Sequence, residues 1–422
     1  AREDWVRFLW ETERQAWIRL RRFLKEDLGV RGLVVGTIVG TSTPTLMADL
    51  DLVDTHAYWQ HPRFPGREWD PDRWFIRNAS MVDFVEEATV TRLSFRRVAG
   101  KPHMVSEYHH PAPNFYAGEA PLFLGAFGAL QDWDAVFLYT YAHDEARMTA
   151  DRIPGFFDIG PHPTVMANAF AASLLFRRAD LAPARRECRI PLPAQREIEL
   201  VAAHGRAWDV FPVGSLGVDP KTAIRARIAL DLGGDAPAPP AVPPGPPPPS
   251  GEIASDTGEL VWRVDRGAGQ LRIRTPRTKI FVGHPGTQPI DLGHGVVLSV
   301  GSMRRSWCTV ALTLLEGDSF ERGPGRAILV AAGTVENTAM GWKDPEQSTV
   351  GRDWGRGPCR VDGVAATVRF TRAPGSAVPC VRALDPRGQP AASVEAVGSP
   401  EGLTDVRIGP PHRTLWYEIV FP

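Results

Sequence analysis

The chain has 422 residues, which is enough for two or three domains of ordinary size and excludes a single small core. Apolar residues make up 43% and charged residues 23%, and 48 basic residues against 49 acidic ones give a formal net charge of −1. A chain so close to neutral has no overall field that would recruit nucleic acid or anionic lipid. Its longest apolar runs, such as residues 165–176, are shorter than the roughly 20 residues of a membrane-spanning helix.

The sequence begins at Ala1 with a charged amphipathic pattern and without a basic, apolar leader. We therefore expect either that a leader was removed or that the numbering begins inside a larger protein. Thirteen tryptophans outnumber six tyrosines; indole rings suit the faces of sugars, although most tryptophans are core residues. The four cysteines lack the spacing of a zinc site, so we expect neither a metal nor a cofactor: Cys188, Cys308, Cys359 and Cys380.

The first half of the chain alternates strand-like and helical patterns. Apolar residues recur every three or four positions over residues 4–28 and Gly29 follows, which predicts an amphipathic helix. The strands expected next are residues 33–38, 50–56, 103–108 and 135–141, and the further helices are residues 78–97, 121–131 and 162–178. Such alternation with almost continuously apolar strands predicts a parallel sheet buried on both faces, in a doubly wound fold or a (β/α)8 barrel.

Beyond about residue 182, short alternating runs separated by Gly, Pro and Asp predict a β-sandwich. The strands expected there are residues 259–264, 270–275, 279–283, 296–300, 308–315, 327–332, 365–371 and 414–421. Residues 189–192 and 228–232 are candidates for the same domain. Residues 235–250 contain nine prolines, which favours an extended polyproline linker between domains or a loop inserted within the β-domain.

Polar and aromatic residues follow the predicted parallel strands at their carboxyl ends, where such folds carry functional side chains. Because these ends meet at one edge of a sheet, we expect the side chains to converge on one site. The candidates for substrate binding and catalysis are Thr37, His56, Tyr58, Trp59, Glu107, His109, Asn114 and Trp133.

The order of these strand ends resembles a known family. A glutamate within Ser-Glu-Tyr, one strand after a His-Ala-Tyr-Trp end and one before a Trp-bearing strand, is similar to the second half of a clan A glycoside hydrolase of families 5 and 39. The resemblance covers roughly residues 1–180 and rests on order and spacing. It implies that residues 1–182 supply strands five to eight of a (β/α)8 barrel, and that residues 183–422 form an accessory β-sandwich.

The resemblance also implies a reaction, the retaining hydrolysis of β-glycosidic bonds in an oligo- or polysaccharide. Glu107 would be the nucleophile, Tyr58 would hold its carboxylate, and His56 and Trp133 would line the sugar subsite. A hydrogen-bond donor such as Tyr58 favours the ionised form that a nucleophile needs. A protein with this activity would be secreted, periplasmic or on the cell surface.

One catalytic group of this family has no counterpart in the sequence. The retaining mechanism needs a second carboxyl group about 5 to 5.5 Å from the first, and the family carries it in an Asn-Glu motif at the end of strand four. The chain contains no Asn-Glu dipeptide, and the helix at residues 4–28 takes the place of helix four. Four strands cannot close a barrel. We expect an upstream segment or a second polypeptide to supply the other half-barrel and the acid/base residue.

Two other functions stay open. A non-catalytic carbohydrate-binding or scaffold protein would keep the cleft and lack the second carboxylate. A metal-dependent hydrolase would bind its metal at His56 or His109, although no HExxH motif is present. The absence of a G-x-S-x-G elbow around Ser106 and of a G-x-G-x-x-G turn disfavours a serine hydrolase and a dinucleotide-binding enzyme.

Overall fold

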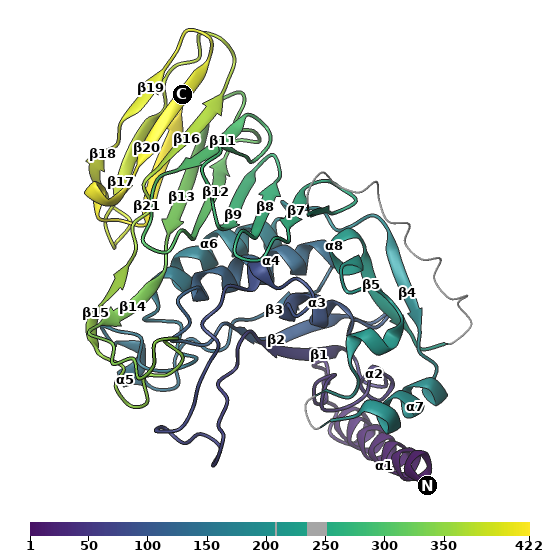
Figure 1. Cartoon of the computed structure of the whole chain (residues 1–422). Coiled ribbons are helices and arrows are strands. Elements are labelled where there is room, and N and C mark those ends of the chain that lie inside the picture. The colour runs from purple at the N-terminus through teal and green to yellow at the C-terminus, as the bar shows by residue number, and fades with distance from the viewer. Residues whose placement is uncertain (207–208, 234–250) are drawn as a thin grey trace.

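The computed structural model describes residues 1–206, 209–233 and 251–422, so the proline-rich residues 235–250 lie outside it. The described residues form a mixed α/β protein with a small parallel sheet, a layer of helices and two antiparallel sheets (Figure 1). In this part of the chain no sheet closes into a barrel. Its helices include none that is long and apolar enough to cross a membrane.

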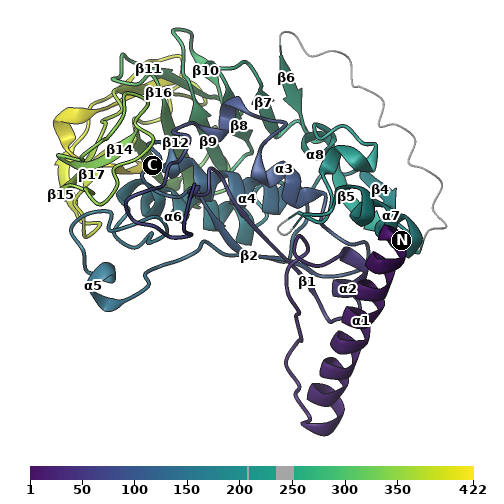
Figure 2. The same cartoon turned by 60° about the horizontal axis from the view of Figure 1, so that its bottom comes forward.

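The N-terminal helix α1 (Arg2–Arg22) continues as a short π-helical segment (Phe23–Asp27), close to the expected helix. One side of α1 packs against α2 (Pro44–Ala48) and α7 (Ala194–His204). At this contact the Trp10 Nε1 donates a hydrogen bond to the buried Glu197 carboxylate at 2.8 Å. The rest of α1 extends away from the body of the molecule (Figure 2).

The parallel sheet contains β1 (Val53–Tyr58), β2 (His103–His109) and β3 (Ala135–Val136), in this order. The strand expected at residues 33–38 is reduced to a single bridge between Ile38 and Asp54. The strand expected at residues 135–141 is only two residues long. Both edges of this sheet are therefore without a further strand in the described residues.

Helices follow the parallel strands, and two of the three agree with the sequence. Helices α4 (Ala120–Leu130) and α6 (Pro163–Arg177) lie where the pattern predicts them, whereas only α3 (Thr89–Ser94) forms within the helix expected at residues 78–97. The buried Glu119 carboxylate accounts for part of the difference. It accepts hydrogen bonds from the Ser80 hydroxyl and the Met81 backbone N–H, both at 2.6 Å, and so holds this segment outside a regular α-helix.

Every strand expected beyond residue 259 is present, in two antiparallel sheets. The nine-stranded sheet contains, from edge to edge, β18 (Pro390–Ser393), β17 (Cys380–Leu384), β21 (Trp416–Phe421), β13 (Gly325–Ala332), β12 (Cys308–Glu316), β9 (Thr278–Gly283), β8 (Gln270–Arg274), β7 (Leu260–Arg263) and β6 (Glu252–Ala254). The five-stranded sheet contains β10 (Ile290–Asp291), β11 (Val296–Val300), β16 (Ala366–Thr371), β20 (Leu403–Ile408) and β19 (Ala396–Gly398).

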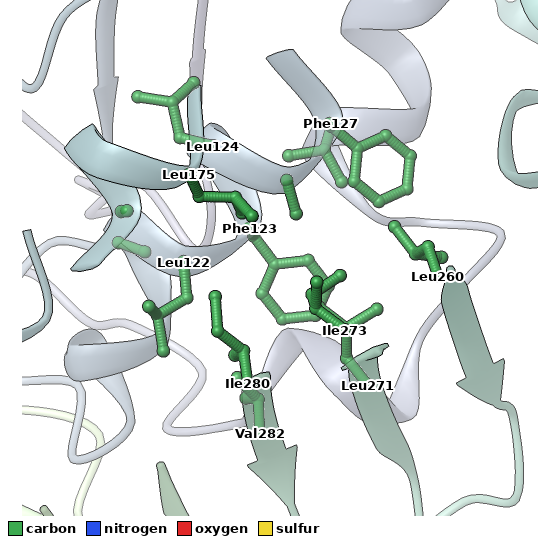
Figure 3. Packing of buried hydrophobic residues seen from close by; sticks show 14 of the residues in the cluster. Leu122, Phe123, Leu124, Phe127, Leu175, Leu260, Leu271, Ile273, Ile280 and Val282 are labelled. Atoms are coloured by element: carbon green, nitrogen blue, oxygen red, sulfur yellow. The ribbon is translucent and has the colours of Figure 1, made fainter. Parts of the chain in front are cut away.

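Alternate residues of β9 belong to different apolar clusters. Ile280 and Val282 belong with Phe123 of α4, and Figure 3 shows Phe123 pointing towards these strands. Phe281 belongs to the cluster that also contains Val368 of β16. Because successive strand side chains point to opposite faces, helices cover one face of the nine-stranded sheet and the five-stranded sheet covers the other.

The two runs considered for the β-sandwich, residues 189–192 and 228–232, pair with each other instead. They form a two-stranded parallel sheet of β4 (Glu187–Pro191) and β5 (Arg227–Asp231), outside both antiparallel sheets. A parallel bridge from Leu230 to Val98 links this pair to the loop after α3. The remaining elements are the short helices α5 (Glu145–Met148) and α8 (Thr222–Arg225) and the hairpin of β14 (Val335–Thr338) and β15 (Arg356–Val361).

Candidate functional site

A shift in strand register sets the geometry of the candidate site. Thr55 of β1 pairs with Val105 of β2, but the next residue, His56, pairs with Glu107. Ser106 is therefore an extra residue in β2, in the manner of a β-bulge. Such an insertion re-aims the side chains around it. Here it places Glu107 beside His56.

Glu107 is held on one side by two residues of β1. The Tyr58 hydroxyl donates a short hydrogen bond to Glu107 Oε2, and His56 Nδ1 lies 3.4 Å from the same oxygen. The other carboxylate oxygen, Oε1, accepts no hydrogen bond from the described residues, and the side chain is 29% exposed. One oxygen is fixed by the protein while the other stays accessible.

The phenol of Tyr58 is suited to act only as a donor. Burial, together with the hydrogen bond to the Glu107 carboxylate, raises the pKa of Tyr58 well above its usual value of 10.0. The hydroxyl therefore keeps its proton throughout the physiological pH range and remains a hydrogen-bond donor to Glu107 Oε2.

Asp54 lies beside His56 on the side of the imidazole that faces away from Glu107 and contacts it directly and through Ser106. Its carboxylate accepts hydrogen bonds from the Thr55 N–H at 2.7 Å, the Ser106 N–H at 3.0 Å and the Ser106 hydroxyl at 2.5 Å. His56 Nε2 lies 2.7 Å from Ser106 Oγ and 3.4 Å from Asp54 Oδ2. Burial alone would raise the pKa of Asp54, but the hydrogen bonds from His56 and Ser106 outweigh it and lower the pKa. His56 thus lies between two carboxylates.

Aromatic rings from later loops surround Tyr58. Its ring centroid lies 5.0 Å from that of Phe157, 5.5 Å from that of His61 and 6.3 Å from that of Tyr139. Trp69, which is 57% exposed, continues this group outward with its ring 5.8 Å from His61. We did not predict these contacts, although Trp69 and Tyr139 do follow strand ends in the sequence.

The structure does not bring two predicted tryptophans beside Glu107. Trp59 directly follows the last residue of β1, and its buried indole N–H donates to the Ala79 carbonyl at 2.8 Å. Trp133 is 4% exposed and packs on His103, which begins β2. It therefore lies at the opposite end of the sheet from Glu107 and cannot line a subsite there.

Three further candidates are also placed elsewhere. His109 is fully buried next to His162, and burial holds its pKa well below the usual value, so it is neutral and closed to a ligand. Asn114 is buried and braces a loop through Ala79 and Tyr116. Thr37 contacts Thr41 at 3.0 Å, and no hydrogen bond of the described residues links it to Glu107.

The metal-dependent alternative requires a cluster of ligands. Across residues 1–206, 209–233 and 251–422, no three His, Cys, Asp or Glu side chains are grouped so that they could hold a metal ion. The two histidines named for that alternative lie in different surroundings, because His56 is engaged by Ser106 and Glu107 while His109 is enclosed.

No protein-family model matches the chain, and no curated protein matches it either. The candidate function therefore rests on the chemistry of the site. That site presents one accessible carboxylate, held by a phenol and an imidazole at the carboxyl ends of two parallel strands. A carboxylate so placed can act as a nucleophile or as a general base.

Proposed function

We propose that this chain carries the nucleophile of a retaining β-glycoside hydrolase and that Glu107 has that role. The hydrogen bond from Tyr58 to Glu107 carries the proposal. It holds Oε2 and leaves Oε1 free to attack an anomeric carbon.

In this reaction Glu107 Oε1 forms a bond to the anomeric carbon while the bond from that carbon to the leaving oxygen breaks. A general acid protonates the leaving oxygen, and water then hydrolyses the glycosyl ester with the same group acting as base. Tyr58 and His56 orient Glu107 through Oε2, and the exposed Trp69 offers an indole face to the sugar C–H groups.

The acid/base residue is proposed to come from outside the described site. Asp54 is the one described carboxylate that shares a neighbour with Glu107, through His56, and its oxygens are already occupied by Thr55 and Ser106. We propose that β1, β2 and β3 correspond to strands six to eight of a barrel and residues 33–38 to strand five. The two antiparallel sheets would be the accessory β-sandwich.

The surface beside residues 33–38 supports a missing half-barrel. Large apolar side chains are exposed along α1 and the segment after it, on a helix that projects from the body of the molecule (Figure 2). These side chains are Trp5, Phe8, Leu9, Ile18, Leu20, Phe23, Leu28, Val30, Leu33 and Val35. Exposed apolar side chains in this number along one segment indicate an interaction site. An upstream segment or second polypeptide would cover it and close the sheet edge.

A non-catalytic carbohydrate-binding or scaffold protein is the second candidate. It is favoured by one observation, the lack of a second carboxylate facing Glu107 among the described residues. The aromatic group around Tyr58 would serve sugar binding equally well in either function. A polysaccharide ligand would in both cases place the protein in the periplasm, on the cell surface or outside the cell.

Trapping the glycosyl-enzyme tests the proposal. The purified protein is incubated with a panel of 2-deoxy-2-fluoro β-glycosides and digested, and the peptides are analysed by mass spectrometry. We expect a sugar adduct on the peptide that contains Glu107 and none in the Glu107→Gln variant. An adduct on another residue would reject Glu107 as the nucleophile. Sugar binding without an adduct, in a sample that contains the partner half-barrel, would favour the second candidate.

A further inference from the structure

A cavity of about 250 Å³ lies immediately after the carboxyl end of β1. Its lining combines two arginines, Arg63 and Arg77, with Gln60, His61 and Glu87. A cavity of this size with several polar groups is suited to a small polar ligand such as one sugar residue.

The cavity carries one uncompensated positive charge. No carboxylate of the described residues pairs with Arg63, whereas Arg77 lies 3.4 Å from Glu87 in an ion pair exposed to solvent. An exposed pair of this kind contributes only about 0 to 1 kcal/mol, so a ligand anion can replace Glu87 at little cost. Desolvation lowers the pKa of His61, which disfavours a positive charge on its imidazole.

The guanidinium of Arg77 is held in place before any ligand arrives. Its central carbon lies over the Phe84 ring, 3.9 Å from the ring centroid, and Nη1 donates a hydrogen bond of 3.4 Å to Glu87. Arginine presents a planar fork of donors that matches the oxygens of a carboxylate or a sulfate. The cavity is therefore preorganised for a single oxyanion.

His61 connects this cavity to the proposed catalytic carboxylate. Its ring lines the cavity and lies 5.5 Å from the Tyr58 ring, and the Tyr58 hydroxyl bonds Glu107. The ring of the exposed Trp69 meets the same histidine edge-on, with the two ring centroids 5.8 Å apart. Neighbouring sugar residues of one glycan can thus contact the cavity, the aromatic group and Glu107 together.

We propose that the cavity is a subsite for a sugar residue that carries one acidic group, a carboxylate or a sulfate ester. This inference rests on the proposed function, because the acidic residue belongs to the glycan presented to Glu107. The chain as a whole has a net charge of −1 and does not attract polyanions in general. Recognition of the acidic group therefore depends on Arg63 and Arg77.

Binding to the full chain with the Glu107→Gln substitution tests the subsite without turnover. Calorimetry compares β-linked mannuronate, sulfated carrageenan and neutral cello-oligosaccharides of equal length. We expect one acidic series to bind at least tenfold more tightly than the neutral series, and added salt to weaken that binding. The uronate and sulfate series identify which acidic group is recognised.

Substitution of the arginines locates the binding. Arg63→Gln is expected to lower the affinity for the acidic glycan by about tenfold or more, since a hydrogen bond to a charged group contributes about 1.5 to 3 kcal/mol. Arg67→Gln is the matched control, because Arg67 is an exposed arginine of the same loop that does not line the cavity. The control variant should bind as tightly as its parent.

Three outcomes would overturn the subsite proposal. Acidic and neutral glycans would bind equally well, neither acidic series would bind, or Arg63→Gln would leave the affinity for the acidic glycan unchanged. The proposed function fails in a different way. Arg63-dependent binding of an acidic glycan, combined with no fluorosugar adduct on Glu107 in the presence of the partner half-barrel, would retain the subsite and reject the hydrolase.

Discussion

The parallel sheet and the nine-stranded antiparallel sheet use their faces differently. On the helix side of the parallel sheet, Val105 and Tyr108 belong to the core cluster of Phe123, whereas the opposite face carries Tyr58 and Glu107. The central strands of the nine-stranded sheet contribute apolar residues to clusters on both faces, because helices cover one face and the five-stranded sheet covers the other. A polar face can persist inside such a fold only where each polar group has a partner.

This difference separates the residues that serve chemistry from those that serve stability. Changes on the polar face of the parallel sheet should alter turnover and leave unfolding unaffected. Changes within the nine-stranded sheet should do the reverse. Four substitutions, taken from the largest expected effect to the smallest, test whether the separation holds.

Glu107→Gln should abolish turnover, by more than about a thousandfold, because it removes the attacking charge at nearly constant shape. Its urea unfolding midpoint should match that of the parent protein. Glu11→Gln, which changes an exposed glutamate of α1, should retain full activity. Steady-state rates and urea titrations measure both quantities, and unchanged turnover in Glu107→Gln would reject the nucleophile assignment.

Phe281→Ala should have the opposite effect. The Phe281 ring is fully buried in the cluster that joins the two antiparallel sheets, so its truncation leaves a cavity and costs about 3 to 5 kcal/mol of stability. Phe137→Ala, at a ring that is half exposed, should cost less than about 0.5 kcal/mol. Urea unfolding checks both values. A large loss of kcat in folded Phe281→Ala would show that the two regions are not separable.

Tyr58→Phe should lower kcat by about 10 to 100-fold and change KM little, because it removes the hydrogen bond that orients the Glu107 carboxylate. Tyr141→Phe is the control, since Tyr141 is exposed and its hydroxyl has no hydrogen-bond partner among the described residues. An effect confined to KM would instead make Tyr58 a wall of the sugar subsite.

Asp51→Asn should loosen the C-terminal end of the projecting helix. Asp51 accepts hydrogen bonds from Arg21 at 2.7 Å, Lys25 at 2.9 Å and the Val34 N–H at 2.9 Å, so its loss should cost about 1 to 2 kcal/mol. Urea unfolding measures this cost. Asp27→Asn, at an exposed aspartate nearby, should cost nothing.

The same contact predicts a pH dependence. The hydrogen bonds from Arg21, then Lys25 and Val34, lower the pKa of Asp51 below its usual 3.8. A carboxyl whose pKa is lowered on folding stabilises the protein above its unfolded pKa, and this contribution is lost as the pH falls through the folded pKa. The stability difference between the parent and Asp51→Asn should therefore be constant above about pH 5 and shrink below 3.8. A difference that grows in acid would contradict this account.

The sequence predicted the antiparallel strands better than the site. Alternation of apolar residues is a local signal, and it located strands such as β9 and β12 within a few residues. The prediction of a helix at residues 78–97 was largely wrong. The Glu119 carboxylate accepts hydrogen bonds from Ser80 and Met81, which lie far from it in the chain. Such contacts leave no periodic trace in the sequence.

Within the site, the sequence analysis predicted that Tyr58 and Glu107 lie close together, because they stand at the carboxyl ends of consecutive parallel strands. Trp59 directly follows Tyr58 just beyond the end of β1, and its indole bonds Ala79 instead of approaching Glu107. Trp133 precedes β3 and packs on His103, so it lies away from the carboxyl ends of the strands. The extra residue at Ser106, the Asp54 support and the ring of Phe157 depend on pairing and loop paths that no local pattern reveals.

Ser106 changes which residues of β2 point to each face of the parallel sheet. Val105 and Tyr108 both face the helices although they are three positions apart, an odd spacing that regular alternation forbids. The extra residue compensates for the odd spacing, and it lets the neighbouring side chains of Ser106 and Glu107 both contact His56 of β1. Deleting Ser106 alone would restore even alternation and keep Glu107 on its side, so β2 should tolerate a change of length at that position better than at its neighbours.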